Sequence, residues 1–219
     1  VTHLTEDEVR GIINVVEGDG SILPFEDEFI GQDLVSGNLK GSKIKEVVPV
    51  DLFGAEEWIL ENGIKVVYKK ADYEKDNVSL YAHSYGGTSL YGVKDLPNAE
   101  NAAVFTNAYG AGEFNSIALG KALAGKMVSC STTIGTDSEV ITASSTPQDM
   151  ETMFELLYLR FTSPRMDEDK FQSILNQNLA NVDKICKNPN KIIQDSIDFI
   201  TSNYNPRTQP LSRKYLESI

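Results

Sequence analysis

Apolar residues recur at helical spacing near the start of the chain. Residues 5–8, Thr-Glu-Asp-Glu, form a capping box, in which the Thr5 hydroxyl and the Glu8 carboxylate can satisfy free amides at a helix start. Apolar side chains then follow at the spacing of one helical face, at Val9, Ile12, Ile13 and Val16. This pattern predicts a helix that ends at Gly18.

Residues 20–54 carry glycines, two prolines and scattered apolar positions without a sustained helical or alternating period. We expect an extended connector there. Its apolar residues should dock on a folded surface, because a free linker rarely carries so many: Phe25, Phe29, Leu34, Val47 and Val48.

Alternating patterns and turn residues predict strands in the middle of the chain. Residues 57–61 and 64–70 form a predicted hairpin, because Asn62-Gly63 between them accepts the positive φ of a type I′ turn. Residues 78–85 alternate between two sets of side chains, as in a strand with two different faces, and end at Gly86-Gly87. Residues 127–134 and 139–145 are rich in Thr, Val and Ile and predict a second hairpin.

Helical patterns lie between and after these strands. We expect helices over residues 98–108, through residues 117–123, from Thr146-Pro147 to Ser163, from Asp167 onward and from Asn188-Pro189 onward. Residues 211–219 resemble the opening of another helix. Because hairpins are followed by helices and do not alternate strictly with them, the sequence predicts an α+β domain. Its sheet should be mainly antiparallel, with helices packed on it.

Charge and length narrow the possible partners. The chain has 219 residues, with 20 basic and 32 acidic side chains and a net charge of −12, so phosphate backbones and anionic bilayers should be repelled. No apolar run approaches the roughly 20 residues that span a bilayer. We therefore expect neither nucleic acid nor a membrane as a partner. The chain begins with Val and stops inside a predicted helix, so we expect a piece of a longer protein and infer no compartment.

Few residues are available for metal or nucleophilic chemistry. His3 and His83 are the two histidines, and neither has a second histidine or a cysteine at ligand spacing, so a hydrolytic zinc site is not expected. A serine triad built on His83 stays combinatorially open, although no Gly-x-Ser-x-Gly elbow is present. Cys130 and Cys186 favour two separate buried thiols over a disulfide.

The glycine-rich points favour turns over nucleotide binding. Residues 86–89 and 110–112 do not have the spacing of a phosphate loop or a dinucleotide-binding loop. Gly120-Lys121 and Gly125-Lys126 lack the earlier glycine that such a loop needs.

Acidic and aromatic residues provide two weaker candidates. Residues 167–169, Asp-Glu-Asp, complement the positive end of a helix dipole, and no loop of alternating oxygen ligands for calcium follows them. Four tyrosines could line a peptide groove, or could form the rim of an ordinary sheet: Tyr81, Tyr85, Tyr91 and Tyr109.

The order of several segments resembles a known family. Residues 58–67, Trp-Ile-Leu-Glu-Asn-Gly-Ile-Lys-Val-Val, precede a strand and then Gly-Gly-Thr-Ser-Leu at 86–90. This arrangement resembles the opening of one half of an M16 (pitrilysin-like) zinc peptidase. Residues 123–129 and 146–165 are similar to later signatures of the non-catalytic half. Their shared order covers nearly the whole chain.

The resemblance implies a division of the chain. Residues 1–55 would be the end of a preceding catalytic half plus the linker between the halves. Residues 56–219 would be the first domain of the non-catalytic C-terminal half, an M16 or LuxS-like metallohydrolase domain truncated at its C-terminus.

The resemblance also implies where the metal is held. In such enzymes a His-x-x-Glu-His motif, on the helix after the Gly-Gly-x-Ser strand of the catalytic half, holds zinc. The corresponding residues here, 98–106, include no histidine, so Glu100 is not assigned as a base. No catalytic, cofactor-binding or metal-ligating residue is carried over. Zinc is expected in the catalytic half of the parent protein and not in this fragment, which is expected to be inactive by itself.

Three possibilities remain open at this point. The resemblance implies a wall of a substrate chamber in a zinc metalloendopeptidase, with the catalytic half or a paired subunit opposite and an extended polypeptide substrate between them. The alternative is a stand-alone module that binds peptides or supports assembly. A His-x-x-Glu-His motif upstream would favour the first, and a start codon near Val1 the second. An unrelated α+β domain is the third possibility. An isolated piece is expected to expose an apolar patch and to self-associate.

Overall fold

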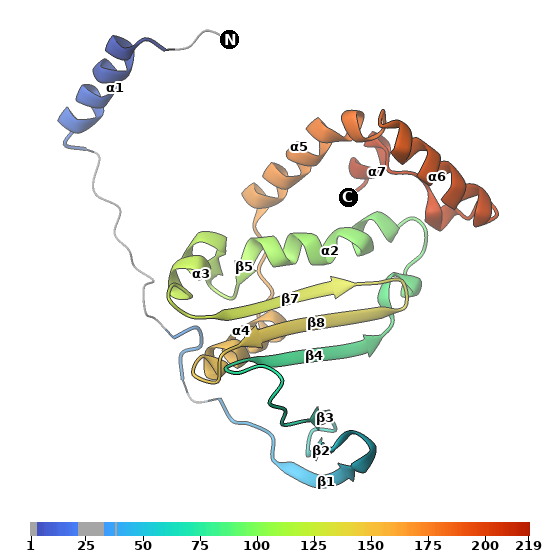
Figure 1. Ribbon diagram of the computed structural model, residues 1–219. Coiled ribbons are helices and arrows are strands. Elements are labelled where there is room, and N and C mark those ends of the chain that lie inside the picture. Colours follow the sequence, from blue (N-terminus) through green and yellow to red (C-terminus); the bar gives the residue numbers. More distant parts are fainter. Residues whose placement is uncertain (1–3, 22–32, 38) are drawn as a thin grey trace.

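The computed structural model describes residues 4–21, 33–37 and 39–219 (Figure 1). Its strands form two three-stranded sheets and one short ladder, and every pairing is antiparallel. The first sheet has the order β1 (Ile44–Val50), β2 (Ala55–Leu60), β3 (Lys65–Tyr68). The central sheet has the order β4 (Val78–Tyr85), β8 (Ser138–Ser145), β7 (Val128–Ile134), and β5 (Gly110–Ala111) pairs with β6 (Phe114–Asn115).

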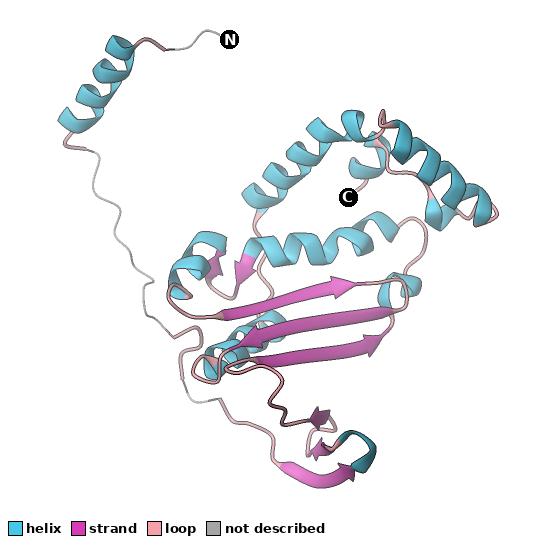
Figure 2. Ribbon diagram, in the orientation of Figure 1, coloured by secondary structure: helices cyan, strands magenta, loops and turns pink. Residues whose placement is uncertain are grey.

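Helices precede, separate and follow the strands (Figure 2). They are α1 (Glu6–Gly18), α2 (Leu96–Tyr109), α3 (Ser116–Ala122), α4 (Met150–Thr162), α5 (Glu168–Ile185), α6 (Pro189–Thr201) and α7 (Arg213–Leu216). The predicted α+β class, with a mainly antiparallel sheet and helices packed on it, is confirmed. In the described part of the chain, no helix is long and apolar enough to cross a bilayer.

Local capping signals identified most helix starts correctly. The Thr5 and Glu8 capping box begins α1, and the Asp167 and Asn188 side chains cap α5 and α6. The predicted cap at Thr146 is wrong by three residues, since Asp149 is the cap and α4 begins at Met150. The Thr146 hydroxyl donates to the Asp149 carboxylate at 2.9 Å and accepts from the Asp149 amide at 3.1 Å. These two bonds hold a turn before the helix.

The first hairpin is confirmed, but its turn is not of type I′. Gly63 has φ of 87°, whereas Asn62 is not among the residues with positive φ. The Gly63 amide donates to the Leu60 carbonyl, and the Asn62 side chain accepts from the Ile64 amide at 3.1 Å. A type I turn followed by a left-handed glycine fits these bonds. The Asn62 side chain stabilises the loop without requiring Asn62 itself to adopt positive φ.

Part of the predicted connector is a strand. Residues 44–50 form β1, which pairs with β2 as an edge strand and so tolerates the proline at position 49. Neither face of β1 is buried, so apolar and polar residues do not alternate along it. Leu34 docks in the core as predicted and is 5% exposed. The prediction that Val47 and Val48 dock is wrong, since both are exposed on β1. Phe25 and Phe29 lie outside the described residues.

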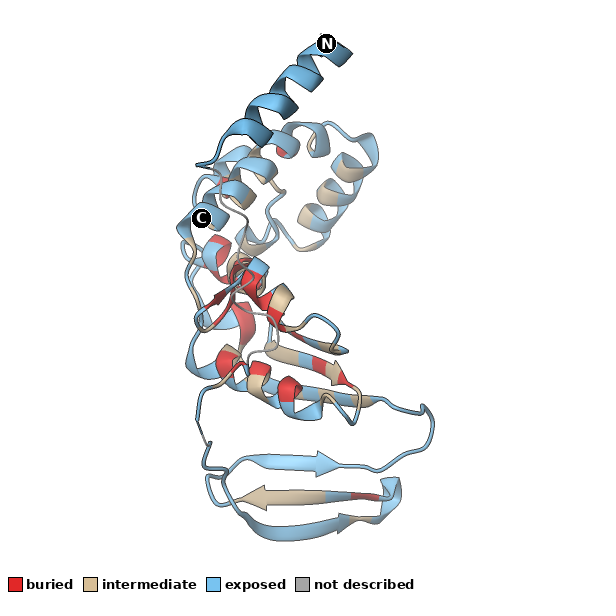
Figure 3. Cartoon of the chain, turned by 90° about the vertical axis from the view of Figure 1, so that its left-hand side faces the viewer, coloured by how far each residue is buried: buried red, intermediate tan, exposed pale blue. Residues whose placement is uncertain are grey.

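The core lies on one face of the central sheet, where α3 and α4 pack against it. Met153 of α4 is fully buried, and Cys130 and Ala143 from adjacent strands lie in the same cluster. Figure 3 shows that buried residues concentrate in the middle of the molecule. By contrast, α1 and α6 contain no buried residue, although each has an apolar face. The expected exposure of apolar surface is therefore present.

Candidate functional site

The central sheet has one face that no helix of the described chain covers. In Figure 1, α4 lies behind the sheet and no element lies in front of it. The strand register places Tyr81 of β4 beside Thr142 of β8, and Thr142 beside Ser131 of β7. The Ser131 and Thr142 hydroxyls are 3.1 Å apart, and the next pair, Ser129 and Ser144, is 2.8 Å apart.

We call this surface the hydroxyl face. It is named for its outward hydroxyl side chains, Ser79, Ser129, Ser131, Thr133, Thr142 and Ser144; half-buried Val140 of β8 lies on the same side. Hydroxyls both donate and accept hydrogen bonds, so the face can bind water or a peptide backbone in many registers. Because it is polar, it is poorly suited to pack as a dry core against another sheet.

A row of aromatic side chains borders the hydroxyl face on β4. Tyr81, His83 and Tyr85 are all exposed and point to the same side of the strand. The Tyr81 and His83 rings have centroids 6.4 Å apart, and the His83 and Tyr85 rings meet edge to face at 4.8 Å. His83 therefore lies in an aromatic row on an open surface. Such rings can stack on the side chains of a bound polypeptide.

The other predicted tyrosines do not join this row. Tyr109 is buried and packs on Phe105, and Tyr91 lies in the loop before α2. Two of the four tyrosines thus share one surface, which strand alternation could have indicated.

The two edges of the central sheet differ. On β7, the Asn107 side chain from α2 pairs with the backbone of Thr132: its amide nitrogen donates to the Thr132 carbonyl at 2.8 Å. The Thr132 amide donates to the Asn107 side-chain oxygen at 3.0 Å. Asn107 thus closes the edge of β7 at Thr132, as a residue of a neighbouring strand would. On the other side, β4 pairs with β8 alone among the described strands.

The segment that the resemblance aligns with the zinc helix lies in α2. Its Ala102, Ala103 and Thr106 line a mainly apolar groove of about 270 Å³ against the ends of β7 and β8. Glu100 accepts a hydrogen bond from the Tyr215 hydroxyl of α7. Burial first, and then this carboxylate, raises the pKa of Tyr215 far above its ordinary value. In this structure Glu100 therefore joins α2 to α7.

Nothing in the described ranges forms a group of three or more His, Cys, Asp or Glu side chains able to hold a metal ion. His83 lies on the open sheet face, and His3 lies outside the described residues. The Asp167 carboxylate accepts from the Lys170 amide at 3.0 Å, which is the predicted role at a helix start. Cys130 and Cys186 are free thiols, as predicted, but Cys186 is only half-buried and donates to the Leu211 carbonyl.

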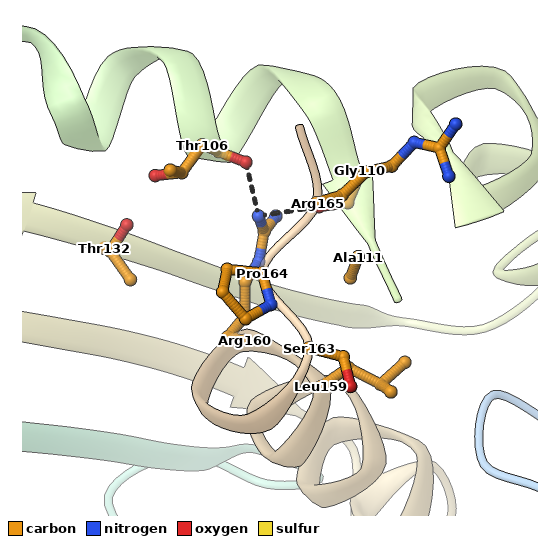
Figure 4. A pocket seen from close by; sticks show the side chains of 9 residues that line it. All are labelled: Thr106, Gly110, Ala111, Thr132, Leu159, Arg160, Ser163, Pro164 and Arg165. Atoms are coloured by element: carbon orange, nitrogen blue, oxygen red, sulfur yellow. Dashed lines mark hydrogen bonds between the residues drawn. The ribbon is translucent and has the colours of Figure 1, made fainter. Parts of the chain in front are cut away.

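Arg160 belongs to α4, and its side chain reaches the end of α2 beside a cavity of about 80 Å³ (Figure 4). One guanidinium nitrogen donates to the Thr106 carbonyl at 2.8 Å and to the Gly110 carbonyl at 2.9 Å. Burial lowers the pKa of Arg160 and raises that of the Cys130 thiol. Carbonyls at the negative end of a helix stabilise a cation, so Arg160 caps α2 and fixes its position on the sheet.

The predicted turn geometry of the glycine-rich points is confirmed. Gly86 and Gly87 have φ of 151° and 63°, and Gly110 and Gly112 have φ of 101° and 56°. The Gly87 amide donates to the Glu139 carboxylate at 2.9 Å. The next two residues donate to carbonyls of the β7–β8 turn. These bonds hold the end of β4 against that turn.

Taken together, these features define an α+β domain with one packed sheet face and one open polar face. No protein-family model matches the chain. A curated relative, a "zinc protease PQQL-like" protein of Arabidopsis thaliana, is 26% identical over 176 residues, which cover 79% of this chain and 16% of the relative.

Solved structures share the fold. The periplasmic protease PqqL from Escherichia coli matches 98% of this chain and 23% of its own length, with a TM-score of 0.74 and 16% identity. The ferredoxin protease FusC, in complex with Arabidopsis ferredoxin, matches 100% of this chain and 24% of its own, with a TM-score of 0.68 and 20% identity. A peptidase M16 inactive domain from Pseudomonas fluorescens matches 75% and 42%, with a TM-score of 0.57 and 18% identity.

These findings confirm the predicted resemblance: the chain is similar in sequence to a zinc protease PQQL-like protein, and it has the fold of a solved peptidase M16 inactive domain. The chain spans 16% of the length of its curated relative, and less than half of each solved chain named above.

Proposed function

We propose that this chain is a non-catalytic portion of an M16-type zinc metalloendopeptidase and forms part of the wall of its substrate chamber. The observation that carries the proposal is the hydroxyl face, an open polar sheet surface opposite the packed core. In the parent protein, a catalytic half of the same chain or a paired subunit would face this wall. Polypeptide would be hydrolysed between them.

The chemistry of the hydroxyl face supports contact with polypeptide. A surface that packs permanently on another domain is apolar at its centre, whereas this one presents serine and threonine hydroxyls. Hydroxyls can pair with the N–H and C=O groups that every peptide carries, whatever its sequence. The exposed rings of Tyr81 and Tyr85 add stacking surface beside them. FusC, which shares this fold, has been captured in complex with a protein, ferredoxin.

Zinc would be held by the catalytic half of the parent protein. In this chain, the α2 segment aligned with the zinc motif offers alanines and a threonine to its groove, and Glu100 is hydrogen-bonded to Tyr215. These groups do not fit a zinc ion, because zinc in proteins is held by imidazole, thiolate or carboxylate ligands that converge on one point. We therefore assign no catalytic, cofactor-binding or metal-ligating residue here.

The proposal divides the chain at about residue 55. Residues 1–55 would be the end of the preceding domain and the linker, and residues 56–219 the domain of the inactive half. The apolar face of α1 supports the first assignment, since none of its residues is buried and it would pack on the preceding domain. The pairing of β1 with β2 joins the two parts across this boundary.

The test is reconstitution. The chain alone, supplied with Zn²⁺, is expected to hydrolyse no peptide, while addition of the chain to the isolated catalytic half should restore cleavage of an unfolded polypeptide. A Thr142→Lys variant, which places a charge in the middle of the hydroxyl face, should restore less. Tyr73→Ala, which changes an exposed residue off that face, should restore as much as the unaltered chain. Zinc-dependent hydrolysis by the purified chain alone would refute the proposal.

A stand-alone peptide-binding or assembly module remains the second candidate. The open hydroxyl face favours it as well, because that face is available without a second half. In that case the chain should bind polypeptide, and the catalytic half should cleave equally well without it.

The isolated chain is also proposed to self-associate through its exposed apolar faces. Light scattering should show a mass above that of one chain for this chain, and the mass of one chain for the parent protein at equal concentration. Monomers in both would contradict this.

A further inference from the structure

One short segment anchors the connector to the core of the domain. Among the described residues that precede β2, Leu34 alone is buried, and it lies in the core cluster with Met153 of α4. Val35 packs against the same cluster, whereas Asp33 is exposed. We call residues 33–35 the anchor segment. It belongs to no helix or strand, so side-chain packing and local hydrogen bonds hold it in place.

The anchor segment also meets a carboxylate of α4. The backbone amide of Leu34 donates a hydrogen bond to the carboxylate of Glu155, which is half-buried. The carboxylate of Asp33 lies close enough to Glu155 for the two negative charges to repel each other. Docking of the segment therefore brings both a hydrogen-bond donor and a second negative charge to Glu155.

The charges around Glu155 decide how a proton affects docking. They are those of Asp33 on the segment, Lys126 after α3 and Glu151 one turn earlier on α4. Burial raises the pKa of Glu155 most, and the charge of Asp33 raises it further. The hydrogen bond from the Leu34 amide lowers this pKa by less than Asp33 raises it. Docking thus favours a proton on Glu155, and by linkage that proton favours docking.

We propose that the anchor segment is a proton-linked clasp, which ties the connector to α4 more tightly when Glu155 carries a proton. Because the pKa of Glu155 is raised above its ordinary value of 4.5, the added stability is present below pH 4.5 and is lost as pH rises through the raised pKa. Packing of Leu34 supplies the part of the attachment that does not depend on pH. The clasp sets how firmly the chain before residue 33 is held to this domain.

Hydrogen exchange at the Leu34 amide measures the clasp directly, because that amide donates to Glu155. Its protection factor, which corrects for the intrinsic effect of pH on exchange, should be about twofold or more higher at about pH 5 than at about pH 8. The amide of Met153, in the core part of α4, is the internal reference for the stability of the whole fold. An equal change at both amides would assign the effect to the whole fold and overturn the proposal.

Neutral substitutions test the charges one at a time. Asp33→Asn removes the repulsion and should raise protection of the Leu34 amide at about pH 8 by about twofold or more. Glu155→Gln keeps an oxygen acceptor but cannot titrate, so protection should become the same at both pH values. Glu151→Gln is the matched control, since its charge affects Glu155 least, and it should leave the pH dependence in place. A pH dependence that survives Glu155→Gln would overturn the proposal.

A further variant tests the packing of Leu34. Leu34→Ala should lower protection of the amide at position 34 by about tenfold or more. Leu39→Ala, at an exposed site of the same connector, should change it by less than about twofold. Equal protection in these two variants would show that Leu34 does not hold the segment and would overturn the clasp. The Asp33 and Glu155 variants keep Leu34, so the charge test does not depend on the folding of Leu34→Ala.

The clasp is independent of the proposed function. If the Leu34 amide shows the pH dependence but the chain does not restore cleavage by the catalytic half, the proposed function fails and the clasp stands. If cleavage is restored but protection at Leu34 does not change with pH, only the present inference fails.

Discussion

Asn107 is predicted to be the side chain on which the closed edge of the central sheet most depends. Replacing it with alanine removes the donor to the Thr132 carbonyl at 2.8 Å and the acceptor from the Thr132 amide at 3.0 Å. It also removes the bond at 3.1 Å from the Thr132 hydroxyl. Both backbone groups of Thr132 lie in a partly buried position, so water replaces these bonds only in part.

The magnitude follows from these bonds. Each hydrogen bond contributes about 1 kcal/mol net, and a polar group left without a partner adds a penalty, so we expect a loss of about 2–3 kcal/mol for Asn107→Ala. For a chain of this size that loss lowers the midpoint of thermal unfolding by roughly 4–12 °C. Circular dichroism on heating measures the shift, and hydrogen exchange at the Thr132 amide should accelerate in the same variant.

Asn98→Ala is the matched control. Asn98 is also on α2 but is exposed, so its loss should change stability by less than about 0.5 kcal/mol. Asn107→Asp keeps the acceptor but loses the donor and sets a carboxylate against the Thr132 carbonyl, so it should not recover the stability. The reasoning is refuted if Asn107→Ala behaves like Asn98→Ala, or if exchange at Thr132 is unchanged.

Three further predictions concern the core, a turn and pH. Met153→Ala, at a fully buried site, should cost about 2–5 kcal/mol in urea unfolding, whereas Met150→Ala at an exposed site should cost far less. Gly87→Ala should lower the free energy of unfolding, because φ of 63° alone costs about 1–3 kcal/mol for a residue with a side chain. The clash adds to this, since a Cβ would lie 2.4 Å from the Gly135 carbonyl oxygen. A melting point like that of the unaltered chain would contradict this. Hydrogen bonds from Met127 and Thr146 lower the pKa of Asp149, so its contribution to stability is present above about pH 4 and is lost as pH falls through the lowered pKa. Asp149→Asn should therefore unfold with a flatter acid dependence, and parallel curves would argue against this role.

Much of the fold was predictable, because its signals are local. The alternation of residues 78–85 predicted β4, and Asn188-Pro189 predicted the start of α6. The errors also have local causes. Neither face of β1 is buried, so its residues do not alternate, and the hydrogen bonds between Thr146 and Asp149 hold a turn in place of the first three predicted residues of α4.

The candidate site was only partly predictable. Strand alternation placed Tyr81, His83 and Tyr85 on one side of β4, but did not show which side was open. Nothing in the sequence around Asn107 indicates that its side chain pairs with a strand 25 residues away. Arg160 gave no signal either, since its acceptors are carbonyls that lie 50 and 54 residues earlier in the chain.

By itself, the sequence determined which segments are helices and strands, because these depend on residues close together in the chain. It also determined the scarcity of histidine and the family resemblance, which follow from composition and from the order of the segments. Tertiary structure alone decided that one sheet face is covered and the other open, and that β7 is closed while β4 is unpaired. The physical reason is that covering a sheet face and pairing a sheet edge both need residues from distant segments of the chain. Those partners, α4 for the face and Asn107 for the edge, reach the sheet only when the chain has folded.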